Sequence, residues 1–315
     1  MARIQRRYAG LGTLGVAVLL AACGSATDKD AGNVLPSAGT VSSSATTNGK
    51  LGVVAAENFW GDIARQIGGD IVQVTSIISN PGTDPHEYET NAEDGAAIAE
   101  ANFVIENGVG YDDFVDKLLA ASPKSDREVL KIADVVGASK DANPHLWYDP
   151  DYVTKAARAI EAQLAKEDPV HVTAYRANLA TFLQGEQQVV DVIDQIKAGH
   201  AGDEIAYTER VPGYLIEAAG LTLGTPASFS QAIEDGNDPS PGDNAAFQLA
   251  LKDRKVKALL YNAQVTSPIT QKLKHLATSN GVSVVGVTET LPPNEKNFQT
   301  WQADQARALL AALGG

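Results

Sequence analysis

From Leu51 onward, short apolar runs alternate with segments in which apolar residues recur every three or four positions. The short runs predict buried strands, and the recurrence at three and four predicts helices with one apolar face. In the first half of the chain we expect strands over 51–56, 71–78, 103–108 and 129–133, and helices over 59–67, 96–102 and 113–121. Strands that alternate with helices indicate βαβ units and a mainly parallel sheet.

The same alternation returns in the second half. Strands are expected over 203–208, 256–261 and 282–288, and helices over 211–220, 244–252, 268–279 and from 298 onward. Between the halves, a helix over 152–166 is followed by one apolar stripe that continues to residue 196. A helix of about 30 residues is roughly 45 Å long, which is more than one small lobe needs. An ordinary surface helix would give the same stripe, but the immediate restart of the alternation favours a rigid spacer. We therefore predict an α/β protein with two lobes, each with a parallel-type sheet, joined by one long rigid helix.

The N-terminal residues have a different pattern. Arg3, Arg6 and Arg7 precede an uncharged apolar stretch over 11–22, which is too short to span a bilayer and is typical of a secretory signal. The sequence Leu20-Ala21-Ala22-Cys23 resembles the bacterial lipobox, in which the cysteine is lipidated and becomes the new N-terminus. A cleaved signal with an incidental cysteine is the alternative. Residues 24–50 are rich in Gly, Ser, Ala and Thr, as in a flexible tether.

These patterns predict five segments along the chain. They are a signal peptide over 1–22, the lipidated Cys23 with its tether over 23–50, an N-terminal lobe over 51–168, a linker helix over 169–199 and a C-terminal lobe over 200–315.

Composition and charge narrow the function. The 315 residues have a formal net charge of −14 and a single cysteine. The acidic balance argues against nucleic acid, since binding a polyanion requires a surplus of Lys and Arg. One cysteine excludes a disulfide framework and any multi-cysteine metal cage. The chemistry of this chain must therefore rest on histidines, carboxylates and hydroxyls.

Two histidines follow prolines in loops that come after predicted strands. They are His86, after the strand at 71–78, and His145, after the strand at 129–133. Proline restricts its own backbone and that of the preceding residue, so each imidazole stands on a stiffened loop. A single loop histidine is usually only solvated, but two Pro-His units at equivalent strand ends favour a ligand site.

In the second half, carboxylates occupy the corresponding positions. Glu209 follows the strand at 203–208, and Glu289 follows the strand at 282–288. Each could also cap the next helix or remain solvated. Taken together with the histidines, they would supply two ligands from each lobe, so that lobe closure and metal binding become one event.

From Val53 to the last helix, the chain resembles the metal-binding solute-binding lipoproteins of bacterial ABC importers of the manganese, zinc and iron type. The resemblance is carried by DPHEYE, PHLWYDP, TERVPGYLIEAAGL and GVTETLP. It implies a periplasmic-binding-protein-like fold of the metal-binding class, with one cation between the lobes. It also implies four metal ligands, which fall on His86, His145, Glu209 and Glu289.

The chain departs from zinc-type members at the third ligand, where many of them have a histidine and this sequence has Glu209. It also lacks their His- and Asp-rich loop, because residues 91–100 contain no histidine. Two imidazoles with two carboxylates suit Mn²⁺ or Fe²⁺ better than three imidazoles would, although Zn²⁺ binds tightly to either set. We therefore expect Mn²⁺ as the favoured metal and Zn²⁺ as a close second.

The resemblance implies an extracytoplasmic receptor that is anchored through Cys23 at the outer face of the bacterial cytoplasmic membrane. Such a receptor delivers its metal to an ABC permease with its ATPase, which fits the absence of a GxxxxGK[ST] motif here. We expect a monomer and no enzyme activity. One alternative is a metal-dependent hydrolase, which requires an open coordination position and a general base, and no HExxH motif is present. Another is a surface adhesin with the same fold.

Overall fold

The computed structural model describes residues 49–80, 82–83, 85 and 88–314. The predicted signal peptide, Cys23 and nearly all of the tether lie outside this part of the chain, and so does His86. Within it, no helix combines the length and the apolar character that crossing a bilayer requires.

The first sheet, the N-terminal sheet, contains four parallel strands in the order β2-β1-β3-β4. The strands are β1 (Leu51–Glu57), β2 (Val72–Ile78), β3 (Phe103–Glu106) and β4 (Glu128–Lys131). The helices between and after them are α1 (Asn58–Gly68), α2 (Ala92–Glu100), α3 (Phe114–Ala121), α4 (Ile132–Val136) and α5 (Pro150–Glu167), with single 3₁₀ turns at η1 (Gly69–Ile71) and η3 (Leu146–Tyr148). The predicted strand at 129–133 is shorter than expected, because its last two residues begin α4.

The second sheet, the C-terminal sheet, repeats this arrangement with the order β6-β5-β7-β8, again all parallel. Its strands are β5 (Glu204–Tyr207), β6 (Thr222–Leu223), β7 (Ala258–Asn262) and β8 (Ser283–Val287). Its helices are α7 (Gly213–Ala218), α8 (Ala227–Glu234), α9 (Pro241–Lys252), α10 (Pro268–Ser279) and α11 (Phe298–Leu313). In both sheets the first and third strands lie in the middle, and the central strands β1, β3 and β7 are buried along nearly their whole length.

Three features of this half were not predicted. The two residues of β6 are too few to show a pattern, and α8 covers residues for which no helix was expected. Helix α9 begins three residues earlier than expected, because Ser240 accepts a hydrogen bond from the Asp243 amide and Pro241 occupies the first turn. Both residues are standard signals for a helix start.

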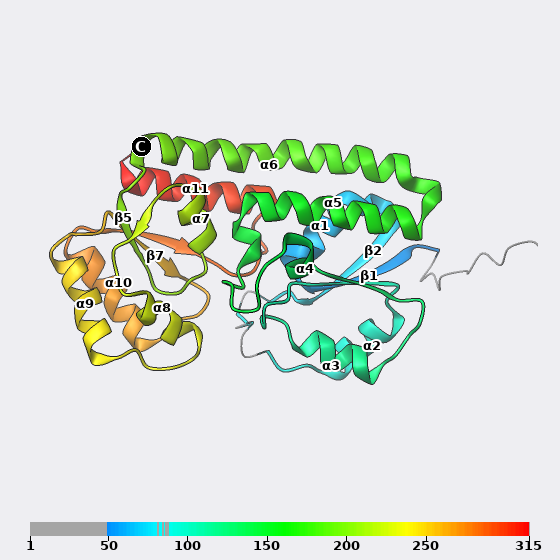
Figure 1. Cartoon of the computed structure of the whole chain (residues 1–315), viewed down its shortest axis with the longest axis horizontal. Helices are drawn as coiled ribbons and strands as arrows, with labels where there is room; N and C mark the ends of the chain where they lie inside the picture. The colour runs from blue at the N-terminus through cyan, green and yellow to red at the C-terminus, as the bar shows by residue number, and fades with distance from the viewer. Residues whose placement is uncertain (1–48, 81, 84, 86–87, 315) are drawn as a thin grey trace, which may run out of the picture. The chain divides into compact units, whose positions relative to one another are not determined.

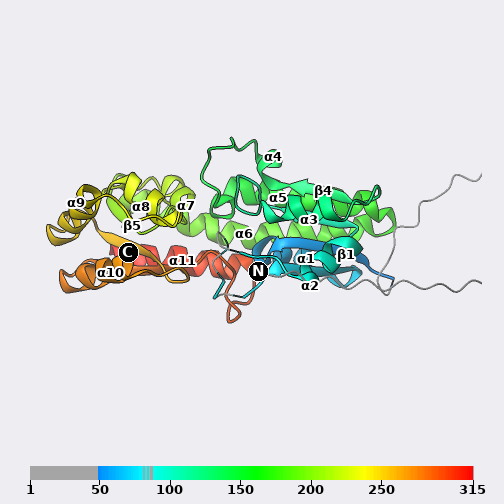
Figure 2. The ribbon, with the colours of Figure 1, turned by 90° about the horizontal axis from the view of Figure 1, so that it is seen from below.

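The long helix α6 (Val172–His200) has 29 residues and follows a short 3₁₀ turn, η4 (Pro169–His171). It packs against α1 and α5 of the first half and against α11 of the second half, as Figures 1 and 2 show. This confirms the predicted α/β fold of two parallel sheets joined by one long helix. The division into domains at 51–168, 169–199 and 200–315 stays a prediction.

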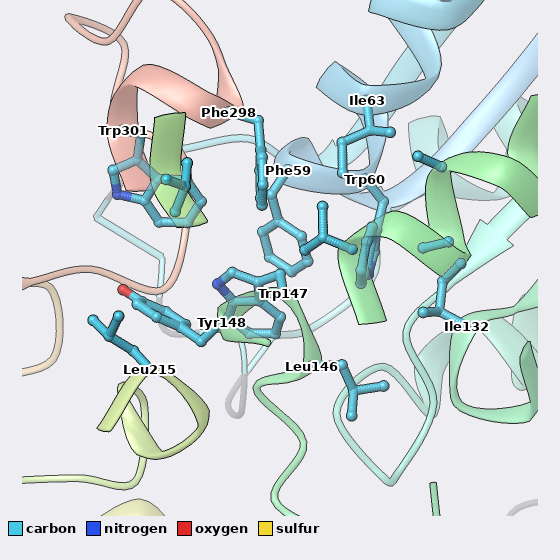
Figure 3. Packing of buried hydrophobic residues seen from close by; sticks show 14 of the residues in the cluster. Phe59, Trp60, Ile63, Ile132, Leu146, Trp147, Tyr148, Leu215, Phe298 and Trp301 are labelled. Atoms are coloured by element: carbon cyan, nitrogen blue, oxygen red, sulfur yellow. The ribbon is translucent and has the colours of Figure 1, made fainter. Parts of the chain in front are cut away.

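An aromatic cluster connects the two halves (Figure 3). Phe59 of α1 stacks on Trp147 of η3 with ring centroids 4.0 Å apart. Trp301 of α11 meets Phe298 edge to face and lies 6.5 Å from Phe59. These rings are almost fully buried, and large aromatic side chains contribute most to the energy of a core. The loop that carries His145 is therefore held firmly at its C-terminal end, because the buried Trp147 follows two residues later.

One residue interrupts the apolar stripe of α6. Leu179 and Ile193 face the core, but the position halfway between them is Glu186, which is also buried. Its Oε2 has no hydrogen-bond partner among the described residues, and burial raises the pKa of this carboxyl to about 8. The folded protein thus keeps Glu186 neutral at a pH at which the unfolded chain has already lost the proton.

This difference predicts how stability depends on pH. Between about pH 4.5 and pH 8 the unfolded state releases the Glu186 proton and the folded state retains it, so the free energy of unfolding should fall as pH rises, by at most ~1.4 kcal/mol per pH unit. Glu186→Gln should make this slope shallower when urea denaturation is measured across the range, because the contribution of Glu186 is lost. Asp194→Asn, an exposed change on the same helix, should keep it. Parallel curves for wild type and Glu186→Gln would contradict the assignment.

Candidate metal centre

The C-terminal sheet brings two predicted ligands together. Glu209 and Glu289 each come two residues after a strand, β5 and β8 respectively, and β7 lies between these strands. The register pairs Tyr207 with Leu260, so Glu209 follows its strand at the level of Asn262, the last residue of β7. Both glutamates are almost completely buried.

Asn262 links these two glutamates directly. Its Nδ2 donates to Glu209 Oε2 and to Glu289 Oε1, each at 2.8 Å. Its Oδ1 accepts from the backbone amides of Gln264 and Val265. One amide group therefore fixes both carboxyl groups at the end of the sheet.

Neither glutamate caps the helix that follows it, which was the alternative role considered from the sequence. Helix α7 begins at Gly213 without a side-chain cap, and α11 begins nine residues after Glu289. The side chains point instead to the shared amide of Asn262.

His145 reaches this place from the first half of the chain. It is fully buried, and its Nε2 lies 3.5 Å from Glu289 Oε2. Its Nδ1 lies 2.7 Å from Asn143 Oδ1, which also accepts the His145 backbone amide. Because Asn143 Nδ2 donates to the Arg210 carbonyl, the amide orientation is set, and the neutral imidazole must donate from Nδ1. That tautomer leaves the Nε2 lone pair directed toward Glu289.

Tyr111 is a further contact from the first half. Its hydroxyl donates to Glu289 Oε2 at 2.9 Å. The preceding turn is held by Asp112, whose carboxylate accepts the amides of Asn107 and Gly108. Burial raises the pKa of Asp112 to about 7, despite these two hydrogen bonds. Gly108 has φ +82, and a Cβ there would lie 2.8 Å from Ala133, so the turn requires glycine at this position.

Hydrogen bonds between the halves surround these residues. The Tyr214 hydroxyl donates to the Asn143 carbonyl at 2.9 Å, and the Tyr148 hydroxyl donates to the Thr288 carbonyl at 2.7 Å. Each bond joins the loop around His145 to a segment directly after β5 or β8. The loop is thus fixed against both glutamate-bearing segments.

The charges next to Glu209 are compensated locally. Arg210 forms a two-pronged ion pair with Glu234, with Nη2–Oε1 at 2.6 Å and Nε–Oε2 at 3.0 Å. A cavity of about 710 Å³ borders Glu209 and is also lined by Glu234, Asp235 and Asp238. An approach lined by carboxylates attracts cations and repels anions.

The structure connects three of the four predicted ligands in pairs. His145 is next to Glu289, and Glu289 shares Asn262 with Glu209. The fourth, His86, lies outside the described residues, and the residues that are described contain no group of three or more His, Cys, Asp or Glu side chains arranged to hold a metal.

Sequence reasoning missed the supporting residues Asn262, Tyr111 and Asn143. Asn143 stands two residues before His145 and directly precedes the PHLWYDP motif, so its position was a usable signal. An asparagine at a strand end and a tyrosine after glycines are otherwise ordinary turn residues.

Several curated proteins are similar to this chain in sequence. The curated relatives include the manganese-binding lipoproteins MntA of Bacillus subtilis (28% identity over 250 residues, 74% of this chain and 77% of the relative) and MntA of Halalkalibacterium halodurans (28% over 202 residues, 58% and 66%). The manganese ABC transporter substrate-binding lipoprotein PsaA of Streptococcus pneumoniae is 26% identical over 241 residues, 71% of this chain and 75% of the relative.

Solved structures share the fold. The periplasmic zinc-binding protein TroA of Treponema pallidum superimposes with a TM-score of 0.72 at 17% identity, over 85% of this chain and all of that one. The manganese-bound periplasmic metal-binding protein of Candidatus Liberibacter asiaticus gives 0.70 at 18% identity, over 84% and 99%.

The family model described as ZnuA, the periplasmic component A of a zinc-uptake complex, matches residues 53–312. That range contains both sheets except for the first two residues of β1, together with the long helix and all four predicted ligands. The chain therefore belongs to the ZnuA family, whose members are components of metal uptake and not enzymes.

Proposed function

We propose that this protein is an extracytoplasmic, lipid-anchored receptor that binds one divalent transition metal ion between its two halves and delivers it to an ABC permease. The observation that carries the proposal is the 3.5 Å distance between His145 Nε2 and Glu289 Oε2, both buried and contributed by opposite halves. Two ligand atoms ~2.1 Å from one ion at a tetrahedral angle lie roughly 3.4 Å apart. The distance thus suits two ligands of a common ion.

The proposed ligand set is His145, Glu209 and Glu289, with His86 as the fourth member. The buried carboxyls and the acidic cavity beside Glu209 support a cation as the cargo. Two nitrogen and two oxygen donors suit Mn²⁺ better than a three-histidine site would, and the relatives named above include manganese-binding lipoproteins. We therefore propose Mn²⁺ as the favoured cargo and Zn²⁺ as a close second, with Fe²⁺ as a third candidate.

The partners follow from membership of an uptake complex. A component of this kind requires a permease, and we propose that the permease acts with its own ATPase. We also propose that lipid on Cys23 anchors the receptor, because the relatives named above are lipoproteins and the sequence before Cys23 resembles a lipobox. The receptor itself would act as a monomer.

Removal of a proposed ligand should weaken metal binding. Isothermal titration of the metal-free protein with Zn²⁺ and Mn²⁺ should give one site, and His145→Ala and Glu289→Ala should each lower affinity at least roughly tenfold, because even residues that only support ligands contribute about that much. His86→Ala should have the same effect if the fourth ligand is assigned correctly. His275→Ala, an exposed change on α10, is the control. Unchanged affinity in both His145→Ala and Glu289→Ala would refute the site.

Asn143 offers a test of how His145 is held. Asn143→Ala removes the acceptor for Nδ1 and should weaken metal binding by about 10- to 100-fold, whereas Asn143→Asp keeps an acceptor and should lose less. ¹⁵N NMR of the metal-free protein should report the Nδ1–H tautomer of His145 in wild type and in Asn143→Asp, and a mixture in Asn143→Ala. Asn178→Ala removes a similar half-buried amide that donates to the Ile67 carbonyl, and it should change neither quantity. A wild-type ring protonated at Nε2 would contradict this geometry.

A further inference from the structure

The side chain of Gln264 holds the backbone of a proposed ligand. Gln264 comes two residues after β7, and its Oε1 accepts the backbone amides of Glu289 and Thr290, each at 3.1 Å. The Thr290 hydroxyl donates to the same oxygen, also at 3.1 Å. Three donors from two consecutive residues therefore converge on one acceptor, and they fix the chain where Glu289 follows β8.

The other end of the same amide group reaches the first half of the chain. Gln264 Nε2 donates to the Thr83 carbonyl at 2.9 Å, and the two residues are 181 positions apart in the sequence. Thr83 belongs to a turn after β2, in which its backbone amide donates to the Asn80 carbonyl at 3.0 Å. Gln264 thus connects the segment after β8 in the second sheet with the segment after β2 in the first.

Only one orientation of the Gln264 amide satisfies these partners. A flipped group would place its oxygen against the Thr83 carbonyl and its NH₂ against the backbone amides of Glu289 and Thr290. The backbone of Gln264 is held as well, because its amide donates to Asn262 Oδ1 at 3.0 Å. The acceptor and the donor of this side chain therefore have separate and fixed tasks.

This connection bears on how a bound ion would leave the site. His145 and Glu289 come from opposite halves, lie 3.5 Å apart and are fully buried. An ion held by both side chains leaves only after its bonds to them break. The carboxyl of Glu289 is already held by Asn262 and Tyr111, so a larger displacement requires its backbone to move too. The hydrogen bonds of Gln264 oppose that movement.

We propose that Gln264 is a positioning residue that fixes the backbone of Glu289 against the first half of the chain and thereby slows release of the bound ion. The inference rests on the proposed function, since it takes Glu289 as a ligand. The acceptor of Gln264 holds Glu289, and the donor holds Gln264 itself against Thr83. One hydrogen bond of ordinary strength changes a rate or an equilibrium roughly 2- to 13-fold.

Two substitutions in the mature protein separate the two tasks. Gln264→Glu keeps an oxygen that accepts from Glu289 and Thr290 but loses the donor to Thr83, whereas Gln264→Met has a similar length and loses both. Each protein is loaded with Zn²⁺ or Mn²⁺ and mixed with excess chelator in a stopped-flow instrument. Gln264→Glu should release the ion roughly 2- to 13-fold faster than wild type, and Gln264→Met faster again. The added negative charge of Gln264→Glu attracts the cation, so charge alone predicts slower release.

Hydrogen exchange in the metal-free protein tests the positioning directly. The amides of Glu289 and Thr290 should exchange slowly in wild type and in Gln264→Glu, and faster in Gln264→Met, which is a local change that a general loss of stability does not produce. Gln248→Met is the matched control, because Gln248 is a half-buried glutamine of the same half that donates to Asn244 within α9. It should change neither the release rate nor the exchange of these two amides.

Two outcomes would overturn the inference. One is release from both Gln264 variants at the wild-type rate, and the other is equal exchange of the Glu289 and Thr290 amides in wild type and Gln264→Met. Failure of wild type to bind either ion would instead refute the proposed function, while the exchange of the two amides could still be measured. The two failures are therefore distinguishable.

Discussion

The burial of two carboxyl groups at neighbouring strand ends is the constraint on which the rest of this structure depends. Glu209 and Glu289 are held within reach of one amide nitrogen, and neither has more than a trace of exposure to water. Two like charges removed from water in this way are costly unless donors or a cation compensate them. The Asn262 amide and the Tyr111 hydroxyl supply part of that compensation, and a divalent ion would supply the remainder.

The fold satisfies this constraint by using one topology twice. In each sheet all strands are parallel, so the loops after them open at the same edge. In the second sheet, that edge carries Glu209, Asn262 and Glu289; in the first sheet, Tyr111 and His145 come from the segments after β3 and β4. Helices α6 and α11 and the aromatic cluster around Trp147 then fix the two edges against each other (Figure 3). Global packing thus determines a geometry that must hold to fractions of an ångström.

Much of this could be predicted from the sequence, for reasons that individual residues make clear. Buried parallel strands have continuous apolar sequences, so the ends of the strands could be located. The residues that follow those ends, His145, Glu209 and Glu289, could therefore be singled out. Asn262 could not be recognised, because its role depends on β7 lying between β5 and β8, and strand order is not encoded in local pattern. Tyr111 and Asn143 act across the two halves, over 178 and 67 positions respectively, which no local pattern reveals. The assignments of His86 and Cys23 stay predictions.

Carboxyl groups elsewhere in the molecule show what distinguishes the site. Glu186 is as deeply buried as Glu209, but no donor in the described part of the chain reaches its Oε2, and burial raises its pKa to about 8, so that it retains a proton. Burial also raises the pKa of Glu57 well above its usual value, and the charge of Asp112 adds to this. Hydrogen bonds donated to a carboxylate favour its charged form, which is the form that binds a cation. The two glutamates at the strand ends differ from Glu186 in this respect, because the Asn262 amide and the Tyr111 hydroxyl donate hydrogen bonds to them.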